Sequence, residues 1–210
     1  MSPDHNPTAT QPPLALYRQR AACYELELLP FEPLCLQALA RLAPQAGETV
    51  LDLGCGTGMS LPALCEAVGP QGRVVGIEAC PDMIAQARRR QARAQWPQLS
   101  LIESPVELAR IEQRADAALC FFTHDILQNE AALQRLQGWL KPGGRVVAVG
   151  LCWAAPWLPL SNAFVLGAAL YSIASARGLD QPWAALSRRL QTEHLERHWM
   201  DAIYLFQGRR

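Results

Sequence analysis

The stretch that decides the fold is Val50-Leu51-Asp52-Leu53-Gly54-Cys55-Gly56-Thr57-Gly58. It begins inside the short apolar run Thr49–Leu53, which fits a strand buried on both faces. The glycines that follow let the backbone turn sharply and let a ligand come close to it. Because loops of this kind serve several cofactors, the glycines alone indicate a ligand-binding loop and leave the ligand open.

Strand-like and helical stretches alternate after this loop. The further strand-like runs are Arg73–Glu78, Leu99–Glu103, Ala115–Phe122 and Arg145–Gly150, and the helical stretches between them are Met59–Val68, Pro81–Trp96, Val106–Ile111 and Asn129–Leu140. This alternation predicts parallel strands joined by crossover helices, which is an open α/β sheet. Ligands of such sheets bind beyond the carboxyl ends of the strands, where the strand order reverses.

The composition suits one folded domain. Of the 210 residues 50% are hydrophobic and 18% are charged, and 19 basic residues balance 19 acidic ones. This excludes a wholly disordered chain and argues against a dedicated nucleic-acid binder, which would carry a basic excess. We expect a flexible tail over 1–13 and a single domain over 14–210, divided into N-terminal helices (14–45), a ligand-binding core (46–150), a helical cap (151–192) and final strands (193–210).

The cysteines and the N-terminus indicate a cytoplasmic protein. The seven cysteines are widely spaced and form no CxxC pair, which is typical of reduced thiols rather than of a disulfide framework or a zinc site. The first residues lack the basic and apolar regions of a secretory signal. Residues 146–176 carry no charge, but Pro156 and Pro159 interrupt them. The helix expected over 162–176 would be about 22 Å long, short for a membrane span.

Two acidic residues sharpen the interpretation of the glycine loop. Asp52 lies two residues before the first glycine, where a carboxylate would repel a pyrophosphate and suit a ligand that carries a sulfonium and an ammonium group. Glu78 ends the second strand, close to the spacing at which an acid meets ribose hydroxyls. The alternative for Glu78 is a charge that stabilises the N-terminus of the following helix.

Four segments together resemble the class I S-adenosylmethionine-dependent methyltransferases, of the type that acts on small molecules. They are residues 50–58, Gly76-Ile77-Glu78, Asp116-Ala117-Ala118-Leu119 and Leu140-Lys141-Pro142-Gly143-Gly144, in the family's order. The resemblance implies a Rossmann-like α/β fold, with a seven-stranded, mostly parallel sheet, an antiparallel last strand, helices on both faces and a helical cap. It also implies S-adenosylmethionine as cofactor and S-adenosylhomocysteine as product.

The resemblance further implies roles for single residues. Gly54, Gly56 and Gly58 would pass under the methionine part of the cofactor, Asp52 would orient its amino group and Glu78 would bind its ribose. The predicted contacts are completed by Cys55, Ala79, Met83 (against the adenine), Phe122, Tyr17, and Ser104 and Val106. Many relatives place an Asp after the third strand to bind the adenine, where this chain has Pro105. Ser104 and backbone groups around Val106 would then take its place.

The acceptor of the methyl group would sit after the fourth strand. His124 follows that strand, and an imidazole, whose ordinary pKa is about 6.5, suits a general base that Asp125 could orient. Alternatively, Thr123 and Asp125 cap the next helix and His124 only packs. Trp153, Trp157, Asn162 and Tyr171 are predicted to line the acceptor, with ordinary core packing or helix capping as the alternative.

The sequence therefore predicts methyl transfer to a small, apolar or aromatic acceptor through an O, N or S atom, by a monomer or homodimer. The chain has no Asn-Pro-Pro-Tyr run, the signature typical of nucleic-acid and protein amide methylation. No metal site is expected, since His194 and His198 fall on a predicted strand that would hold them about 13 Å apart. Three alternatives stay open: a lipid-headgroup N-methyltransferase at a membrane surface, a non-catalytic cofactor-binding regulator, and a nicotinamide oxidoreductase.

Overall fold

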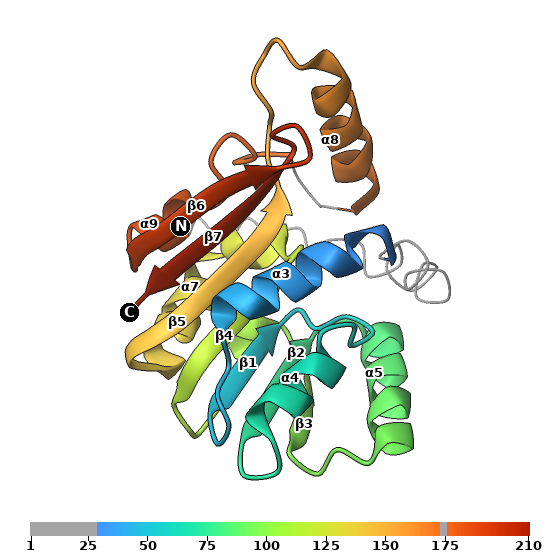
Figure 1. The fold of residues 1–210 in the computed structure, drawn as a ribbon, viewed down its shortest axis with the longest axis vertical. Helices are drawn as coiled ribbons and strands as arrows, with labels where there is room; N and C mark the ends of the chain where they lie inside the picture. The colour runs from blue at the N-terminus through green and yellow to red at the C-terminus, as the bar shows by residue number, and fades with distance from the viewer. Residues whose placement is uncertain (1–28, 173–175) are drawn as a thin grey trace, which may run out of the picture.

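A computed structural model describes residues 29–172 and 176–210 (Figure 1). The first predicted N-terminal helix and Tyr17 lie outside the described residues. The elements in chain order are η1 (Leu29–Phe31), α3 (Glu32–Leu42), β1 (Thr49–Leu53), α4 (Leu61–Val68), β2 (Arg73–Glu78), α5 (Pro81–Ala94), β3 (Leu99–Glu103), η2 (Val106–Leu108), β4 (Ala115–Phe121), α6 (His124–Leu127), α7 (Glu130–Trp139), β5 (Leu140–Leu151), α8 (Pro159–Ser172), α9 (Ala184–Ser187), β6 (Gln191–His198) and β7 (Ile203–Arg209).

The strands form one seven-stranded sheet in the order β3-β2-β1-β4-β5-β7-β6. β1, β2, β3, β4 and β5 pair in parallel, whereas β7 runs antiparallel to both β5 and β6. The mostly parallel sheet with an antiparallel last strand is thus confirmed. The order reverses between β1 and β4, because the chain first builds outward from β1 to β3 and then returns to the other side of β1. The fold therefore opens a crevice beyond the carboxyl ends of these two strands.

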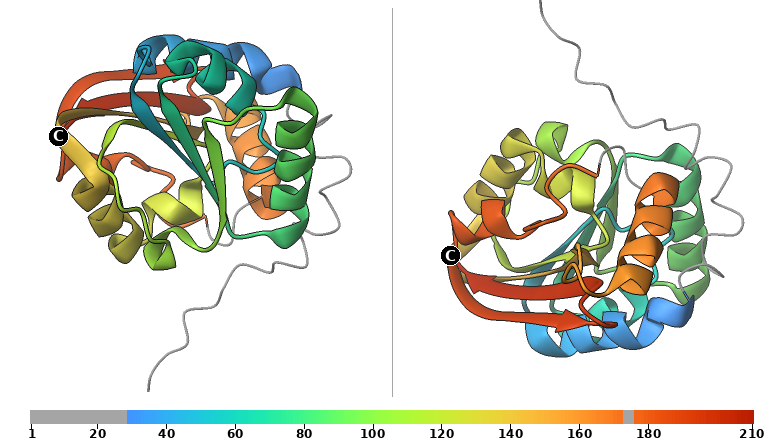
Figure 2. Two further views of the ribbon diagram at one scale, coloured as in Figure 1. Left: turned by 90° about the horizontal axis from the view of Figure 1, so that it is seen from below. Right: turned by 90° about the horizontal axis from the view of Figure 1, so that it is seen from above.

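Two hydrophobic clusters cover the two faces of the sheet, and Figure 2 shows helices on both sides of it. α3 and α4 pack on one face, while α6, α7 and α9 pack on the other. Alternate residues of β5 serve the two clusters, as Val147 and Val149 face the first and Val146 and Ala148 the second. This period of two explains why an uninterrupted apolar run marks a central strand of this sheet.

Three expected elements differ in the structure. Val106–Ile111, expected as a helix, is only the short 3₁₀ helix η2, because Pro105 and a second extended residue at Ala109 bracket it. β5 begins at Leu140, so Lys141-Pro142-Gly143-Gly144 belongs to an irregular first part of this strand. α8 begins at Pro159, where the sequence predicts a break; proline suits the first turn of a helix, because no helical N–H bond is lost there.

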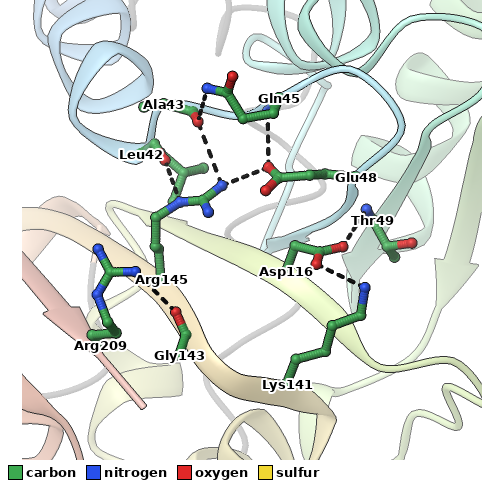
Figure 3. Close-up of polar contacts among 10 residues, drawn as sticks. All are labelled: Leu42, Ala43, Gln45, Glu48, Thr49, Asp116, Lys141, Gly143, Arg145 and Arg209. Carbon is green, nitrogen blue, oxygen red and sulfur yellow. Dashed lines mark hydrogen bonds and ion pairs between the residues drawn. The ribbon is translucent and has the colours of Figure 1, made fainter.

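Polar contacts fix the amino-terminal ends of the central strands, opposite the crevice (Figure 3). Arg145 donates to the Leu42 carbonyl at 2.9 Å and pairs with Glu48 at 2.5 Å. Asp116 accepts from the Thr49 N–H at 2.9 Å and pairs with Lys141 at 2.7 Å. Partial burial alone would raise the pKa of Asp116, but these two partners outweigh it and the pKa lies below its ordinary value. These contacts support a structural role for the Lys141 turn.

α8 stands beside the carboxyl end of the sheet and is apolar around most of its circumference (Figure 1). Among the side chains of α8 that the structure describes, over 159–170, only a narrow stripe is buried: Ser161, Val165 and Ala169. Exposed large apolar side chains gather on this helix, the segment before it and the β6–β7 turn: Trp157, Leu160, Phe164, Leu166, Leu170, Trp199 and Met200. No helix within the described ranges has the length and apolar character needed to cross a membrane.

Candidate active site

A pocket opens at the carboxyl end of β1, at the point where the strand order reverses. It encloses about 330 Å³, including its open mouth. Its lining residues are Asp52, Gly54, Cys55, Gly56, Thr57, Met59, Ser60 and Phe121. The structure therefore brings the predicted residues of the glycine loop together with the last residue of β4 in one cavity.

Asp52 is the buried acid of this pocket. Its side chain is 1% exposed and accepts a hydrogen bond from the Ser60 hydroxyl. Burial raises the pKa of Asp52 to about 7, although the bond from Ser60 favours the charged form and opposes this rise. A carboxylate held in such a place is ready to pair with a cation, because the partner compensates for the lost hydration.

The glycine loop needs its glycines for two separate reasons. Gly54, Gly56 and Gly58 all have positive φ angles, a region that glycine enters at little cost. In addition, a Cβ on Gly54 would lie 2.6 Å from the Thr123 methyl group, and one on Gly58 would lie 2.7 Å from Leu61. The loop thus packs directly against the segment that follows β4, which leaves no room for larger residues.

Glu78 connects the glycine loop to the start of α5. Its two carboxylate oxygens accept from the Gly56 N–H at 2.9 Å and from the Cys80 N–H at 2.8 Å. Burial raises the pKa of Glu78, and these N–H groups oppose the rise. A carboxylate offers about four acceptor positions, so Glu78 can hold the loop and still accept from a ligand hydroxyl.

The other residues predicted around the adenine lie along the same edge of the sheet. The Ser104 N–H donates to the Glu78 carbonyl at 3.0 Å, which joins the ends of β2 and β3. The Ser104 hydroxyl donates to the Pro105 carbonyl at 2.9 Å. Met83 and Val106 are buried and Ala79 is exposed. These residues do not line the pocket itself, so their contact with the cofactor stays a prediction.

His124 begins α6 and is 6% exposed; it follows Thr123, which packs on Gly54, but it does not itself line the pocket. Its Nε2 lies 3.0 Å from the carbonyl oxygen of Arg177, and its Nδ1 is buried without a hydrogen-bond partner among the described residues. The Thr123 side chain makes no capping hydrogen bond to α6. Asp125 is partly exposed and has contacts of its own.

A chain of aromatic rings leads from the pocket to α8. Phe121, in the pocket wall, packs edge-on against Phe122 with ring centroids 4.9 Å apart. Phe31 lies 5.0 Å from Phe122 and also stacks on Trp199 at 5.0 Å. Phe164 of α8 follows at 6.3 Å from Trp199. Segments from four parts of the chain thus provide a continuous aromatic wall.

The residues predicted to contact the acceptor are not gathered at the pocket. Trp153 packs against the core, and Trp157 is 79% exposed. The Asn162 amide accepts from the Ala154 N–H at 2.9 Å and so fixes α8 to the segment after β5. Tyr171 belongs to α8, but its side chain lies outside the described part of the chain. Their contact with an acceptor stays a prediction.

Sequence reasoning missed Ser60, Phe121 and the pair Phe31 and Trp199. Phe121 could have been found, because the last residue of a strand beside the glycine loop faces the same crevice. No sequence signal connects Ser60 to Asp52 or Phe31 to Trp199, since these contacts depend on how separate segments pack.

The described cysteines contribute no reactive group to the site. Cys55 is buried in the pocket wall, and burial raises the pKa of its thiol well above the ordinary value. Cys35, Cys65 and Cys120 have a pKa raised to about 12 by burial. Buried neutral thiols are poor nucleophiles and poor metal ligands. In the described ranges no three His, Cys, Asp or Glu side chains come together as ligands for a metal ion.

His194 and His198 both lie on strand β6, as expected. The second of them lies 3.6 Å from the Glu196 carboxylate.

Sequence comparisons connect this pocket to a known family. The profile of a family described as "Methyltransferase domain" matches residues 50–144. The chain is 34% identical over 113 residues to a demethylmenaquinone methyltransferase of Oceanobacillus iheyensis. This match covers 53% of this chain and 48% of the relative. It is 32% identical over 134 residues to the aklanonic acid methyltransferase DauC of Streptomyces sp., covering 61% of each. Each match covers less than two thirds of the relative's own length.

Solved structures share the fold. The N-methyltransferase NodS of Bradyrhizobium japonicum, in complex with S-adenosylhomocysteine, aligns with a TM-score of 0.68 and 18% identity over 95% of this chain and 99% of that one. A methyltransferase of Aquifex aeolicus aligns with a TM-score of 0.60 and 16% identity over 83% and 88%. The family profile thus matches residues 50–144 to a methyltransferase domain, and the solved structures show that the chain has the fold of S-adenosylmethionine-dependent methyltransferases.

Proposed function

We propose that this protein transfers the methyl group of S-adenosylmethionine to a small, apolar or aromatic acceptor. The observation that carries the acceptor class is the aromatic wall from Phe121 to Phe164, which begins in the pocket and contains no charged side chain. The names of the relatives, a demethylmenaquinone and an aklanonic acid methyltransferase, agree with a small-molecule acceptor.

The residues of the pocket fit the cofactor. The buried Asp52 carboxylate suits the ammonium group of its methionine part, and the tight loop from Gly54 to Gly58 lets the ligand approach the backbone. Glu78 has acceptor positions left for the ribose hydroxyls. When bound, the cofactor supplies a methyl group activated by a positively charged sulfur.

The protein's own part is to align the acceptor and, where needed, to remove its proton. In-line displacement gains most from fixed geometry, which excludes unproductive orientations. We propose His124 as the general base, with Asp125 beside it on the same short helix. The unpaired Nδ1 is the atom that can take the proton.

The function is tested by two measurements on the full chain. Calorimetry should show saturable binding of S-adenosylmethionine and of S-adenosylhomocysteine. Release of S-adenosylhomocysteine is then measured with three probes on one ring system: 1-naphthol, 1-naphthylamine and naphthalene-1-thiol. Turnover with at least one of them supports the proposal and identifies the attacking atom. Saturable binding of a nicotinamide cofactor, with none of S-adenosylmethionine, would sink it.

A second candidate is methylation at a membrane surface, for example of a lipid headgroup. The exposed apolar side chains of α8 and of the β6–β7 turn favour it, because monomeric proteins rarely expose so many together. Co-sedimentation with phosphatidylethanolamine vesicles, followed by methylation of that lipid, would support this candidate. A chain that stays in the supernatant argues against it.

A non-catalytic regulator would bind S-adenosylmethionine. It would form no S-adenosylhomocysteine with the naphthalene probes or with the lipid. We propose the cytoplasm as the site of action, and a monomer or homodimer as the active form. The six described cysteines, all free thiols, support the location.

A further inference from the structure

The two ring nitrogens of His124 have different surroundings. Nε2 lies 3.0 Å from the backbone carbonyl oxygen of Arg177, 53 residues later in the chain. A carbonyl oxygen can only accept, so Nε2 must carry the proton of this hydrogen bond. Nδ1 is buried and meets no donor among the described residues. In the neutral ring Nδ1 therefore keeps its lone pair.

The Arg177 carbonyl is held in place by the turn over residues 176–180. Leu179 is fully buried, and its carbonyl accepts from the Trp153 N–H at 2.9 Å. Gly178 has a φ of +82°, and a Cβ there would lie 2.7 Å from the side-chain oxygen of Gln128. Gln128 directly follows α6, so the turn packs against the same short helix that begins with His124.

We propose that the 176–180 turn is a positioning element, whose Arg177 carbonyl fixes His124 in the Nε2–H form and leaves Nδ1 as the nitrogen that can act as the base. This inference rests on the proposed function. In the step, the Nδ1 lone pair forms a bond to the proton of the acceptor, and the electron pair of the broken heteroatom–hydrogen bond attacks the methyl carbon. The carbon–sulfur bond breaks with its electron pair going to sulfur.

The same contact serves the charged ring that this step produces. After taking the proton, His124 carries hydrogen on both nitrogens and a positive charge. Its Nε2–H still donates to the Arg177 carbonyl, and hydrogen bonds from charged donors are stronger than those from neutral ones. The turn would thus fix the orientation of the neutral His124 ring and stabilise the protonated ring that the step produces.

The direct test is a nitrogen NMR spectrum of the full chain with ¹⁵N-labelled histidine, recorded with and without S-adenosylhomocysteine. The chain has four histidines, and the signals of His124 are those missing in His124→Gln. We expect an Nε2–H proton that exchanges slowly with water and an unprotonated Nδ1. An Nδ1–H form, or an Nε2–H in rapid exchange, would overturn the proposal.

Gly178→Ala tests the turn itself. A residue with a Cβ is strained at the φ of +82°, and its methyl group would push aside the end of the exposed Gln128 side chain, so the turn should loosen and the exchange of the His124 Nε2–H should become about tenfold faster or more. Gly47→Ala is the matched control, because Gly47 has a φ of +84° with no atom within 4 Å of its Cβ position. It shares the backbone strain and should leave the His124 spectrum unchanged.

These readouts separate the two levels of the argument. A Gly178→Ala protein with an unchanged His124 spectrum contradicts the positioning role, whatever the activity. If Gly178→Ala does not fold, the wild-type spectrum decides alone. If the protein does not bind S-adenosylmethionine, the proposed function is wrong. The protonation form of the His124 ring can still be measured in that case, so the positioning role is tested separately. If one of the naphthalene probes is methylated, Gly178→Ala should lower kcat for that probe and leave the affinity for the cofactor unchanged.

Discussion

The Ser60 hydroxyl donates a hydrogen bond to the Asp52 carboxylate inside the wall of the pocket, where Asp52 is 1% exposed. Burial raises the pKa of this carboxyl group to about 7, so its charge changes near neutral pH. The acid that should receive the cofactor's ammonium group is therefore expensive to ionise in the free protein, and binding and stability both become dependent on pH.

Cofactor affinity should rise with pH through about 7. The ammonium group prefers the ionised form of Asp52, and below pH 7 the binding competes with a proton. We expect the affinity for S-adenosylhomocysteine to be about tenfold lower at pH 6 than at pH 8. Calorimetry in two buffers of different ionisation enthalpy should also detect proton release on binding near pH 7. An affinity independent of pH in this range contradicts the pairing.

Asp52→Asn should stabilise the free protein at alkaline pH. Because the folded pKa lies above the unfolded one, the folded state binds more protons between about pH 4 and 7, and the free energy of unfolding falls as the pH rises through this window. The substitution removes a cost of up to about 4 kcal/mol, at about 1.4 kcal/mol per pH unit. Urea unfolding at pH 5 and pH 8 measures it. Asp52→Asn should be more stable than the wild-type protein by about 1.5 kcal/mol at pH 5 and by about 4 kcal/mol at pH 8.

Gly54→Ala should abolish cofactor binding. At a φ of +72° the new Cβ would lie 2.6 Å from the Thr123 methyl group, so the loop has to shift. Gly69→Ala is the matched control, because Gly69 has a φ of +66° and no atom within 4 Å of its Cβ position. Both variants carry similar backbone strain of about 1 kcal/mol. Equal affinity of the two variants for S-adenosylhomocysteine would contradict the role of the close approach.

Glu78→Ala should weaken cofactor binding by about 1–3 kcal/mol, the scale of a lost hydrogen bond to a charged group. Part of the loss should come from the loop, since the Gly56 N–H loses its acceptor. Glu66→Ala, on the exposed surface of α4, serves as control. Calorimetry measures the affinity of both variants for S-adenosylhomocysteine. An unchanged affinity in Glu78→Ala would reject the binding of the ribose by Glu78.

Asp116→Asn should destabilise the fold without changing the site. Its folded pKa lies below the ordinary value, so its contribution to stability is present above about pH 4 and is lost as the pH falls through the folded pKa. We expect a loss of about 1–3 kcal/mol at pH 7 in urea unfolding. Glu103→Gln, which breaks the exposed pair with Arg88, should cost about 1 kcal/mol or less. The opposite ranking would contradict the structural role of Asp116.

Local sequence was sufficient for the first three strands of the chain. β1, β2 and β3 begin and end at the predicted residues, because each is a short apolar run ended by a glycine or an acid. Helices were predicted less well. The stretch after Pro105 forms only η2, and α8 starts three residues earlier than expected. A proline precedes the single turn of η2 and another begins the long helix α8, so the surrounding packing decides how far each helix extends.

The sequence by itself determined the sheet, the glycine loop and the two acids Asp52 and Glu78, because these depend on period, spacing and residue type within one short segment. Only the tertiary structure decided that Ser60 donates to Asp52, that Phe31 and Trp199 extend the wall begun by Phe121, and that Arg177 meets Nε2 of His124. The first of these contacts joins residues 8 apart across the glycine loop, and the others join segments that are distant along the chain. Their geometry comes from the packing of the whole molecule, which no local pattern of residues encodes.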